Sequence, residues 1–168
     1  MFRRFSLISV ILVAALSVGC ASKKKDGEAG AAGGGDSADI SSTDFNFNSQ
    51  GSDSGQIPGL STVNFAYDSS SLDSSSREKL KGNAEWMNKN KSLTIQIEGH
   101  CDANGSVEYN LALGERRANS VKQYLVGLGV DAARLTIISY GKEKLVELGD
   151  TESVHAKNRR ANFVPLAN

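Results

Sequence analysis

The chain has few of the residues that cross-link or stiffen a protein. Its 168 residues include two cysteines, two prolines and one tryptophan, and aromatic residues make up 7 % of the total. One cysteine, Cys20, directly follows an apolar N-terminal segment. If Cys20 is modified, Cys101 is the only remaining thiol and no internal disulfide can form. We therefore expect a fold that is stabilised by a packed apolar core.

An excess of basic residues is also lacking, because 19 Lys and Arg residues balance 19 Asp and Glu residues. Removal of residues 1–19 would take away Arg3 and Arg4 and no acid, which leaves 17 basic against 19 acidic residues and a net charge of −2. Affinity for nucleic acid comes mostly from neutralised phosphates. A mildly acidic chain without a basic tract therefore argues against a nucleic-acid partner.

Residues 1–19 have the pattern of a bacterial export signal. Arg3 and Arg4 precede an apolar stretch, residues 7–18, that is too short to span a bilayer as a stable helix. Small residues then lead to Gly19 and Cys20. A cysteine at this place indicates a lipobox, in which Cys20 becomes the lipidated first residue. The alternative is an ordinary cleaved signal followed by an incidental cysteine.

Residues 20–58 are predicted to be a flexible tether that begins at the lipidated cysteine. Gly, Ser, Ala, Asp and Asn dominate this stretch, and such a composition buries too little apolar surface to offset the entropy of ordering. Its average end-to-end distance would be about 35 Å. Phe45 and Phe47 interrupt the polar composition. They are either a small docking segment or two isolated aromatics.

Residues 60–168 are predicted to form one small α/β domain. Alternating apolar residues predict strands at 63–67, 93–98, 135–140 and 161–166. Ser75 and Glu78 fit a capping box that opens the first helix, with Leu80, Ala84 and Met87 along one face. A second helix is predicted for 107–128, with a buried stripe of Leu111, Ala118, Val121, Leu125 and Leu128. The order strand, helix, strand, helix, strand, strand predicts an α/β sandwich, a mixed sheet with helices on one face.

The most informative residues lie where the second predicted strand meets the second helix. Asp102 ends the strand, while Asn110, Gly114 and Arg117 recur on one face of the helix. An acid and a base on separate rigid elements can bind a ligand that carries both an ammonium and a carboxylate. A plain salt bridge between Asp102 and Arg117 explains the spacing equally well.

Other candidate chemistry finds less support in the sequence. Strand alternation places His100 and Cys101 on opposite sides, so they should not act together as base and nucleophile. His100 and His155 lack companions at metal-ligand spacing. We therefore expect no enzyme, no metal and no cofactor. Arg159 and Arg160 should also point in opposite directions, either toward a ligand or into salt bridges that hold the last strand.

Several long motifs resemble the peptidoglycan-associated lipoproteins of Gram-negative bacteria. They are Phe-Ala-Tyr-Asp at 65–68, Glu-Gly-His-Cys-Asp at 98–102, Glu-Tyr-Asn-Leu-Ala-Leu-Gly-Glu-Arg-Arg-Ala at 108–118, Ser-Tyr-Gly-Lys-Glu-Lys at 139–144 and Ala-Lys-Asn-Arg-Arg-Ala at 156–161. The resemblance covers about residues 60–165. Cys101 departs from it, because the family usually has Thr or Ala there.

The resemblance implies an OmpA-like domain that binds the meso-diaminopimelate stem peptide of peptidoglycan without cleaving it. On the matching positions, Asp102 would pair with a ligand ammonium and Arg117 would clamp a carboxylate with its planar fork. Asp68 matches a third ligand contact. Asn110 is a plausible neutral partner.

The resemblance also implies a place in the cell. Cys20 would anchor the chain in the outer membrane, facing the periplasm, and Ala21 after it favours that membrane by the enterobacterial sorting habit. The family associates with TolB and the Tol system during cell division. Two rival functions are a peptidoglycan hydrolase, which needs a zinc triad or a nucleophile with its base, and the wall-binding domain of a motor stator, which needs a retained transmembrane helix.

Overall fold

The structure is a computed structural model, and it describes residues 50–167. The predicted signal segment 1–19, the lipidation site Cys20, and Phe45 and Phe47 in the predicted tether lie outside the described residues. Within the described range, no helix is both long enough and apolar enough to span a membrane.

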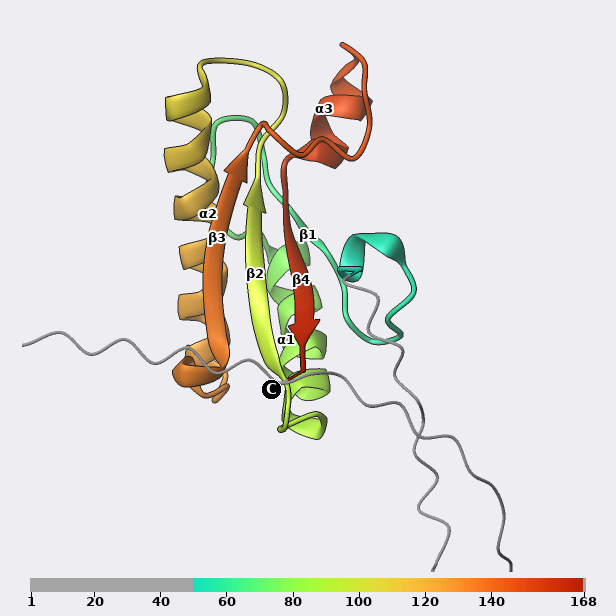
Figure 1. The fold of residues 1–168 in the computed structure, drawn as a ribbon, viewed down its shortest axis with the longest axis vertical. Coiled ribbons are helices and arrows are strands. Elements are labelled where there is room, and N and C mark those ends of the chain that lie inside the picture. The colour runs from blue at the N-terminus through green and yellow to red at the C-terminus, as the bar shows by residue number, and fades with distance from the viewer. Residues whose placement is uncertain (1–49, 168) are drawn as a thin grey trace, which may run out of the picture. The chain divides into compact units, whose positions relative to one another are not determined.

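Four strands form one mixed sheet in the order β1-β4-β2-β3 (Figure 1). Their bounds are Val63–Asn64 for β1, Thr94–His100 for β2, Leu135–Gly141 for β3 and Arg160–Leu166 for β4. The central strand β2 runs parallel to β3 and antiparallel to β4. The short β1 pairs antiparallel with the start of β4. The predicted fold class, with its mixed sheet, is confirmed.

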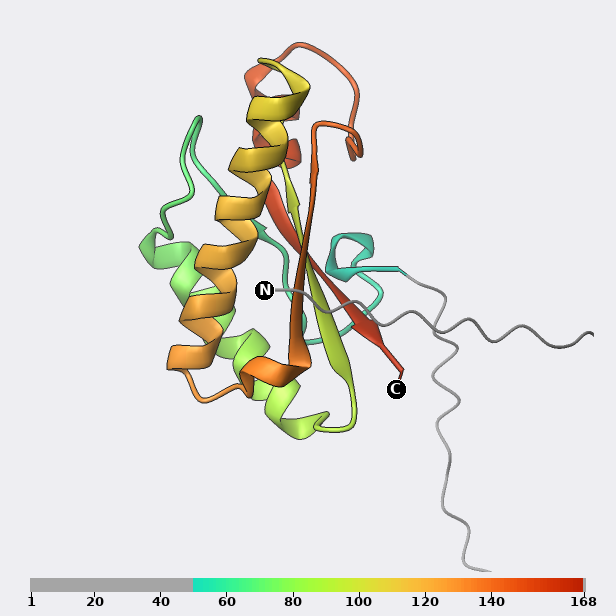
Figure 2. The same ribbon diagram turned by 60° about the vertical axis from the view of Figure 1, so that its left-hand side comes forward.

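Two long helices, α1 (Ser74–Lys89) and α2 (Val107–Gly127), cover the same face of the sheet (Figure 2). Buried apolar side chains from both helices meet those of β2 and β4, among them Leu80, Met87, Val121, Ile97 and Phe163. The chain therefore buries one continuous core between the helices and the sheet. This arrangement fixes the start of α2 against the end of β2, where the candidate site lies.

Two glycines bring β2 and α2 close together. A Cβ atom on Gly99 would lie 1.9 Å from the backbone oxygen of Gly114, and one on Gly114 would lie 2.3 Å from Oγ of Ser139. No side chain fits at either position without moving backbone. The close approach explains why a helix-weakening glycine stands inside α2.

The first helix begins earlier than the capping box predicts. Asp73, rather than Ser75, is the N-cap, and its carboxylate accepts a 2.6 Å hydrogen bond from the amide of Ser76. A carboxylate at this position satisfies a free N–H and also favours the positive end of the helix dipole.

Three further predictions differ from the structure. The first strand ends at Asn64 instead of residue 67. The amide of Phe65 still donates to the carbonyl of Arg159, but the amide of Arg159 donates to His155 and returns no bond to the strand. Leu111 was predicted to be buried but is 38 % exposed, and Leu113 is buried in its place. Between the strands predicted at 135–140 and 161–166, where no helix was predicted, lies a short helix, α3 (Glu152–Asn158), which is capped by Thr151.

The predicted end of the tether at residue 58 is too late. Residues Ser52–Ser54 form a 3₁₀ turn against β4. There Oγ of Ser52 donates to Oδ1 of Asn162 at 2.9 Å and accepts the amide of Phe163 at 3.2 Å. Asp53 forms a 3.1 Å ion pair with Arg160. The folded domain therefore starts by Gly51, because Ser52 and Asp53 bind the Phe163 amide and the side chains of Asn162 and Arg160 in β4.

Candidate functional site

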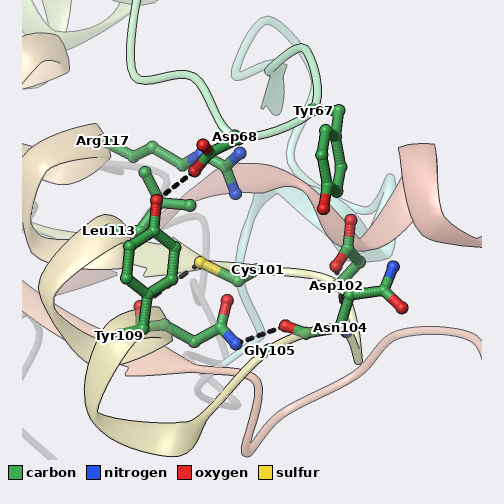
Figure 3. Close-up of a pocket in the computed structure, with 10 residues that line it drawn as sticks. Tyr67, Asp68, Cys101, Asp102, Asn104, Gly105, Tyr109, Leu113 and Arg117 are labelled. Carbon is green, nitrogen blue, oxygen red and sulfur yellow. Dashed lines mark hydrogen bonds between the residues drawn. The ribbon is translucent and has the colours of Figure 1, made fainter.

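A pocket of about 230 Å³ lies where the segment after β1, the β2–α2 loop and the start of α2 meet (Figure 3). The sequence-predicted residues Asp68, Asp102, Asn110 and Arg117 all line it. The other lining residues are Tyr67, Cys101, Asn104, Gly105, Tyr109 and Leu113. The fold thus brings together four residues that are up to 49 positions apart in the sequence.

Arg117 forms the floor of the site, and its side chain is fully buried. Its guanidinium donates to three backbone carbonyls: Nε to Ser69 at 2.8 Å, Nη1 to His100 at 2.9 Å and Nη2 to Ala66 at 3.1 Å. It also lies 5.1 Å from the ring centre of Phe65. Burial lowers the pKa of Arg117 below its ordinary value. Arg117 therefore ties the segment after β1 to the end of β2.

Asp102 is 4 % exposed and forms an ion pair, but its partner is not Arg117. Its Oδ2 lies 3.2 Å from Nη1 of Arg159, and its Oδ1 accepts the amide of Asn104 at 3.1 Å. Asp102 and Arg117 thus line the same pocket, but each of them is bound by other groups. The alternative of a simple Asp102–Arg117 salt bridge is not what the structure shows.

Asp68 and two tyrosines form the rim of the pocket. Asp68 adopts a left-handed backbone conformation with φ of 50°, which is uncommon for a residue other than glycine. The hydroxyl of Tyr109 donates to Oδ1 of Asp68, and this hydrogen bond raises the pKa of Tyr109. Tyr67 is 67 % exposed and stands on the side of Asp102 in Figure 3. The rim therefore presents a carboxylate between two aromatic side chains.

The loop from Asp102 to Ser106 is held from two sides. Nδ2 of Asn110 donates to the carbonyls of Asn104 at 2.6 Å and Ser106 at 2.9 Å. Nζ of Lys142 donates to the carbonyl of Gly105 at 2.6 Å. Asn110 thus uses its amide nitrogen to shape the loop, a role that the sequence did not indicate. Because these bonds already order the loop, little entropy remains to be lost when a ligand binds.

The buried thiol and imidazole nearby contact different groups. Sγ of Cys101 bonds to the carbonyl of Asn110 at 3.3 Å, and burial raises the pKa of this thiol. The ring of His100 lies 3.4 Å from Glu98 and stacks on Tyr140 at 5.5 Å between ring centres. Among residues 50–167 no group of three His, Cys, Asp or Glu side chains could hold a metal ion.

Arg159, whose role the sequence left undecided, does not line the pocket but pairs with Asp102, which does. Besides Asp102 it binds Glu152, with Nη2 and Oε1 2.5 Å apart, while Arg160 pairs with Asp53 elsewhere. The interpretation that these arginines form salt bridges fits the structure. Glu152 was missed altogether, because the helix that carries it was read as a loop. The seven-residue spacing of Glu152 and Arg159 would have been a signal once that helix was recognised.

The sequence is similar to known families and proteins. Residues 64–159 match the model of the OmpA family. The chain is 40 % identical to the peptidoglycan-associated lipoprotein of Mesorhizobium japonicum over 92 % of this chain and 88 % of that protein. It is 38 % identical to the protein of the same name from Pseudomonas aeruginosa over 96 % of each.

Solved structures have the same fold. The crystal structure of the peptidoglycan-associated lipoprotein from Burkholderia pseudomallei superposes with a TM-score of 0.60 at 40 % identity, covering 62 % of this chain and 89 % of that one. The C-terminal domain of Helicobacter pylori MotB has a TM-score of 0.61 at 21 % identity, covering 66 % and 87 %. The MotB likeness concerns the fold alone.

Proposed function

Because this chain belongs to the OmpA family, and within it to the peptidoglycan-associated lipoproteins, we propose that it binds peptidoglycan non-covalently and tethers the outer membrane to the cell wall. The single observation that carries the proposal is the pocket in which Asp102, Asp68 and Arg117 converge. Carboxylates and a guanidinium at one small pocket suit a ligand with both an ammonium and a carboxylate.

The ligand we propose is the meso-diaminopimelate of the stem peptide, which carries both groups. Asp102 would bind the ammonium, and Asp68 on the rim would be a further acidic contact. Three of the five N–H donors of Arg117 serve backbone carbonyls. At most two are left to bind a ligand carboxylate. A pocket of about 230 Å³ suits one end of a side chain rather than a glycan strand.

We propose further that the protein does not cleave its ligand. Within residues 50–167 neither a metal-binding group nor a paired nucleophile and base lies at the pocket. Incubation with purified sacculi should therefore release no soluble muropeptides. If the wild type released muropeptides and Cys101→Ala did not, the function would instead be that of a peptidoglycan hydrolase.

The membrane end of the tether is part of the same proposal. A triacylated Cys20 would hold the chain in the outer membrane on its periplasmic side, and TolB and other Tol proteins would be partners there. Mass spectrometry of the mature N-terminus should show an acylated Cys20. An unmodified cysteine would exclude the anchor while leaving wall binding untouched.

The direct test of wall binding is co-sedimentation of the protein with purified sacculi. Many identical stem peptides in one polymer add avidity to a modest affinity at each site. The protein should therefore pellet with sacculi, and free meso-diaminopimelate should release it. Protein that stays in the supernatant, or that free diaminopimelate does not displace, would contradict the proposal.

A further inference from the structure

One cation, Arg159, is shared between two carboxylates. Its Nη1 lies 3.2 Å from Oδ2 of Asp102 and 3.5 Å from Oε2 of Glu152, and its Nη2 lies 2.5 Å from Oε1 of Glu152. The remaining donor, Nε, binds the carbonyl of Phe65 at 3.2 Å. A single positive charge therefore faces two negative charges and cannot neutralise both.

The three side chains form a row that leads from the pocket to solvent. Asp102 lines the pocket, whereas Arg159 is not one of its ten lining residues. The Arg159 side chain is 6 % exposed, and the Glu152 side chain, in the first turn of α3, is 73 % exposed. A ligand in the pocket would thus meet Asp102, with Arg159 behind it and Glu152 behind Arg159.

The shortest contact of the Arg159 guanidinium is with Glu152. Because the attraction between charges falls with distance, the ion pair at 2.5 Å compensates more of the arginine charge than the contact at 3.2 Å does. The hydrogen bond from Arg159 lowers the pKa of Glu152 below 4.5, so this carboxyl is ionised at neutral pH. Without Glu152, the whole charge of Arg159 would act on Asp102.

We propose that Glu152 is a positioning residue for the ligand site: by holding Arg159, it leaves Asp102 with the negative charge that binds a ligand ammonium. Arg159 keeps one oxygen of Asp102 in place, and Glu152 limits how far Arg159 neutralises it. The inference rests on the proposed function, in which Asp102 contacts the ammonium of diaminopimelate.

The test compares the binding of a soluble muramyl tripeptide ending in meso-diaminopimelate to the full mature chain and its variants. Glu152→Gln removes the charge at an exposed position and should weaken binding about three- to tenfold, because a nearby negative charge is lost. Glu152→Asp keeps the charge and should restore most of the affinity. The matched control is Glu147→Gln, since Glu147 pairs with Lys157 at 2.5 Å and contacts neither Asp102 nor Arg159.

The outcomes separate this inference from the function on which it rests. Wild-type protein that fails to bind the tripeptide would overturn the proposed function and this inference with it. Binding by the wild type with an unchanged affinity in Glu152→Gln would overturn the inference alone. So would equal losses in Glu152→Gln and Glu152→Asp, which would indicate a purely structural contact. Thermal unfolding of each variant shows whether the fold is kept.

Discussion

Nη1 of Arg117 lies 2.9 Å from the carbonyl oxygen of His100, so the arginine at the floor of the pocket binds the end of β2, two residues before Asp102. Two further carbonyls, of Ser69 and Ala66, bind the same guanidinium. Arg117 therefore holds two backbone segments, the stretch after β1 and the end of β2, against α2 before any ligand arrives. Its substitution must therefore affect stability as well as binding.

Arg117→Lys tests this double role. A lysine keeps the charge but cannot reach three separated carbonyls, and each buried acceptor left without a donor costs about 1–3 kcal/mol. We expect the free energy of unfolding to fall by about 2 kcal/mol or more in urea titrations. The control Arg116→Lys changes an exposed residue of the same helix and should stay within about 0.5 kcal/mol of the wild type. Equal stabilities of the two variants would show that the carbonyl contacts are unimportant.

The close approach of β2 and α2 gives a second prediction. Gly99→Ala places a methyl group 1.9 Å from the backbone of Gly114, so strand and helix must separate. We expect a loss of about 3 kcal/mol or more in unfolding free energy, at the upper end of the range for overpacked cores. Gly82→Ala is the matched control, because nothing lies within 4 Å of a Cβ there and it sits inside α1. That variant should gain about 0.5–1 kcal/mol.

The early start of the folded domain can be tested by truncation. A chain that begins at residue 60 lacks the contacts of Ser52 with Asn162 and Phe163, and also the Asp53–Arg160 ion pair. It leaves Arg160, a buried cation, without that carboxylate. We expect it to unfold at a clearly lower urea concentration than a chain that begins at residue 50. If the two chains had the same urea unfolding curve, the folded domain would begin near residue 60, as the sequence predicted.

Glu98 should make the fold sensitive to acid. Burial raises the pKa of Glu98, but the imidazole of His100, 3.4 Å away, and the hydrogen bond from Asn162 outweigh burial and bring the pKa below 4.5. A carboxyl whose pKa is lowered by folding contributes stability above its unfolded pKa and loses it as the pH falls through the folded one. Between pH 5 and pH 3 the wild type should therefore lose more stability than Glu98→Gln. If Glu98 had no such role, the urea midpoints of the wild type and of Glu98→Gln would fall by the same amount across this pH range.

The sequence predicted most of the fold because its signals were local. The alternation of Leu93, Ile95 and Ile97 matches β2, and the spacing of Asn110, Gly114 and Arg117 matches one buried face of α2. Leu111 was assigned to the wrong face, because one helical turn offers two leucines and the buried one, Leu113, is the one that lines the pocket. The seven-residue α3 was missed because it carries no apolar period of its own.

The sequence predicted four candidate site residues but not the groups with which they pair. Asp68, Asp102, Asn110 and Arg117 do line one pocket. The partner of Asp102, however, is Arg159, which is 57 positions away in the sequence. Such a pairing depends on the antiparallel course of β4 beside β2, which no local pattern encodes. The same holds for the three carbonyls that bind Arg117.

The central claim is that the carboxylate of Asp102 binds an ammonium group of the wall peptide. Asp102→Asn keeps the shape of the side chain and an oxygen that can accept from Asn104, while it removes the charge. Calorimetric titration of the full mature chain with the diaminopimelate tripeptide measures the effect. We predict that Asp102→Asn weakens binding by about 100-fold or more relative to the wild type. An unchanged affinity in a folded Asp102→Asn variant would contradict the account.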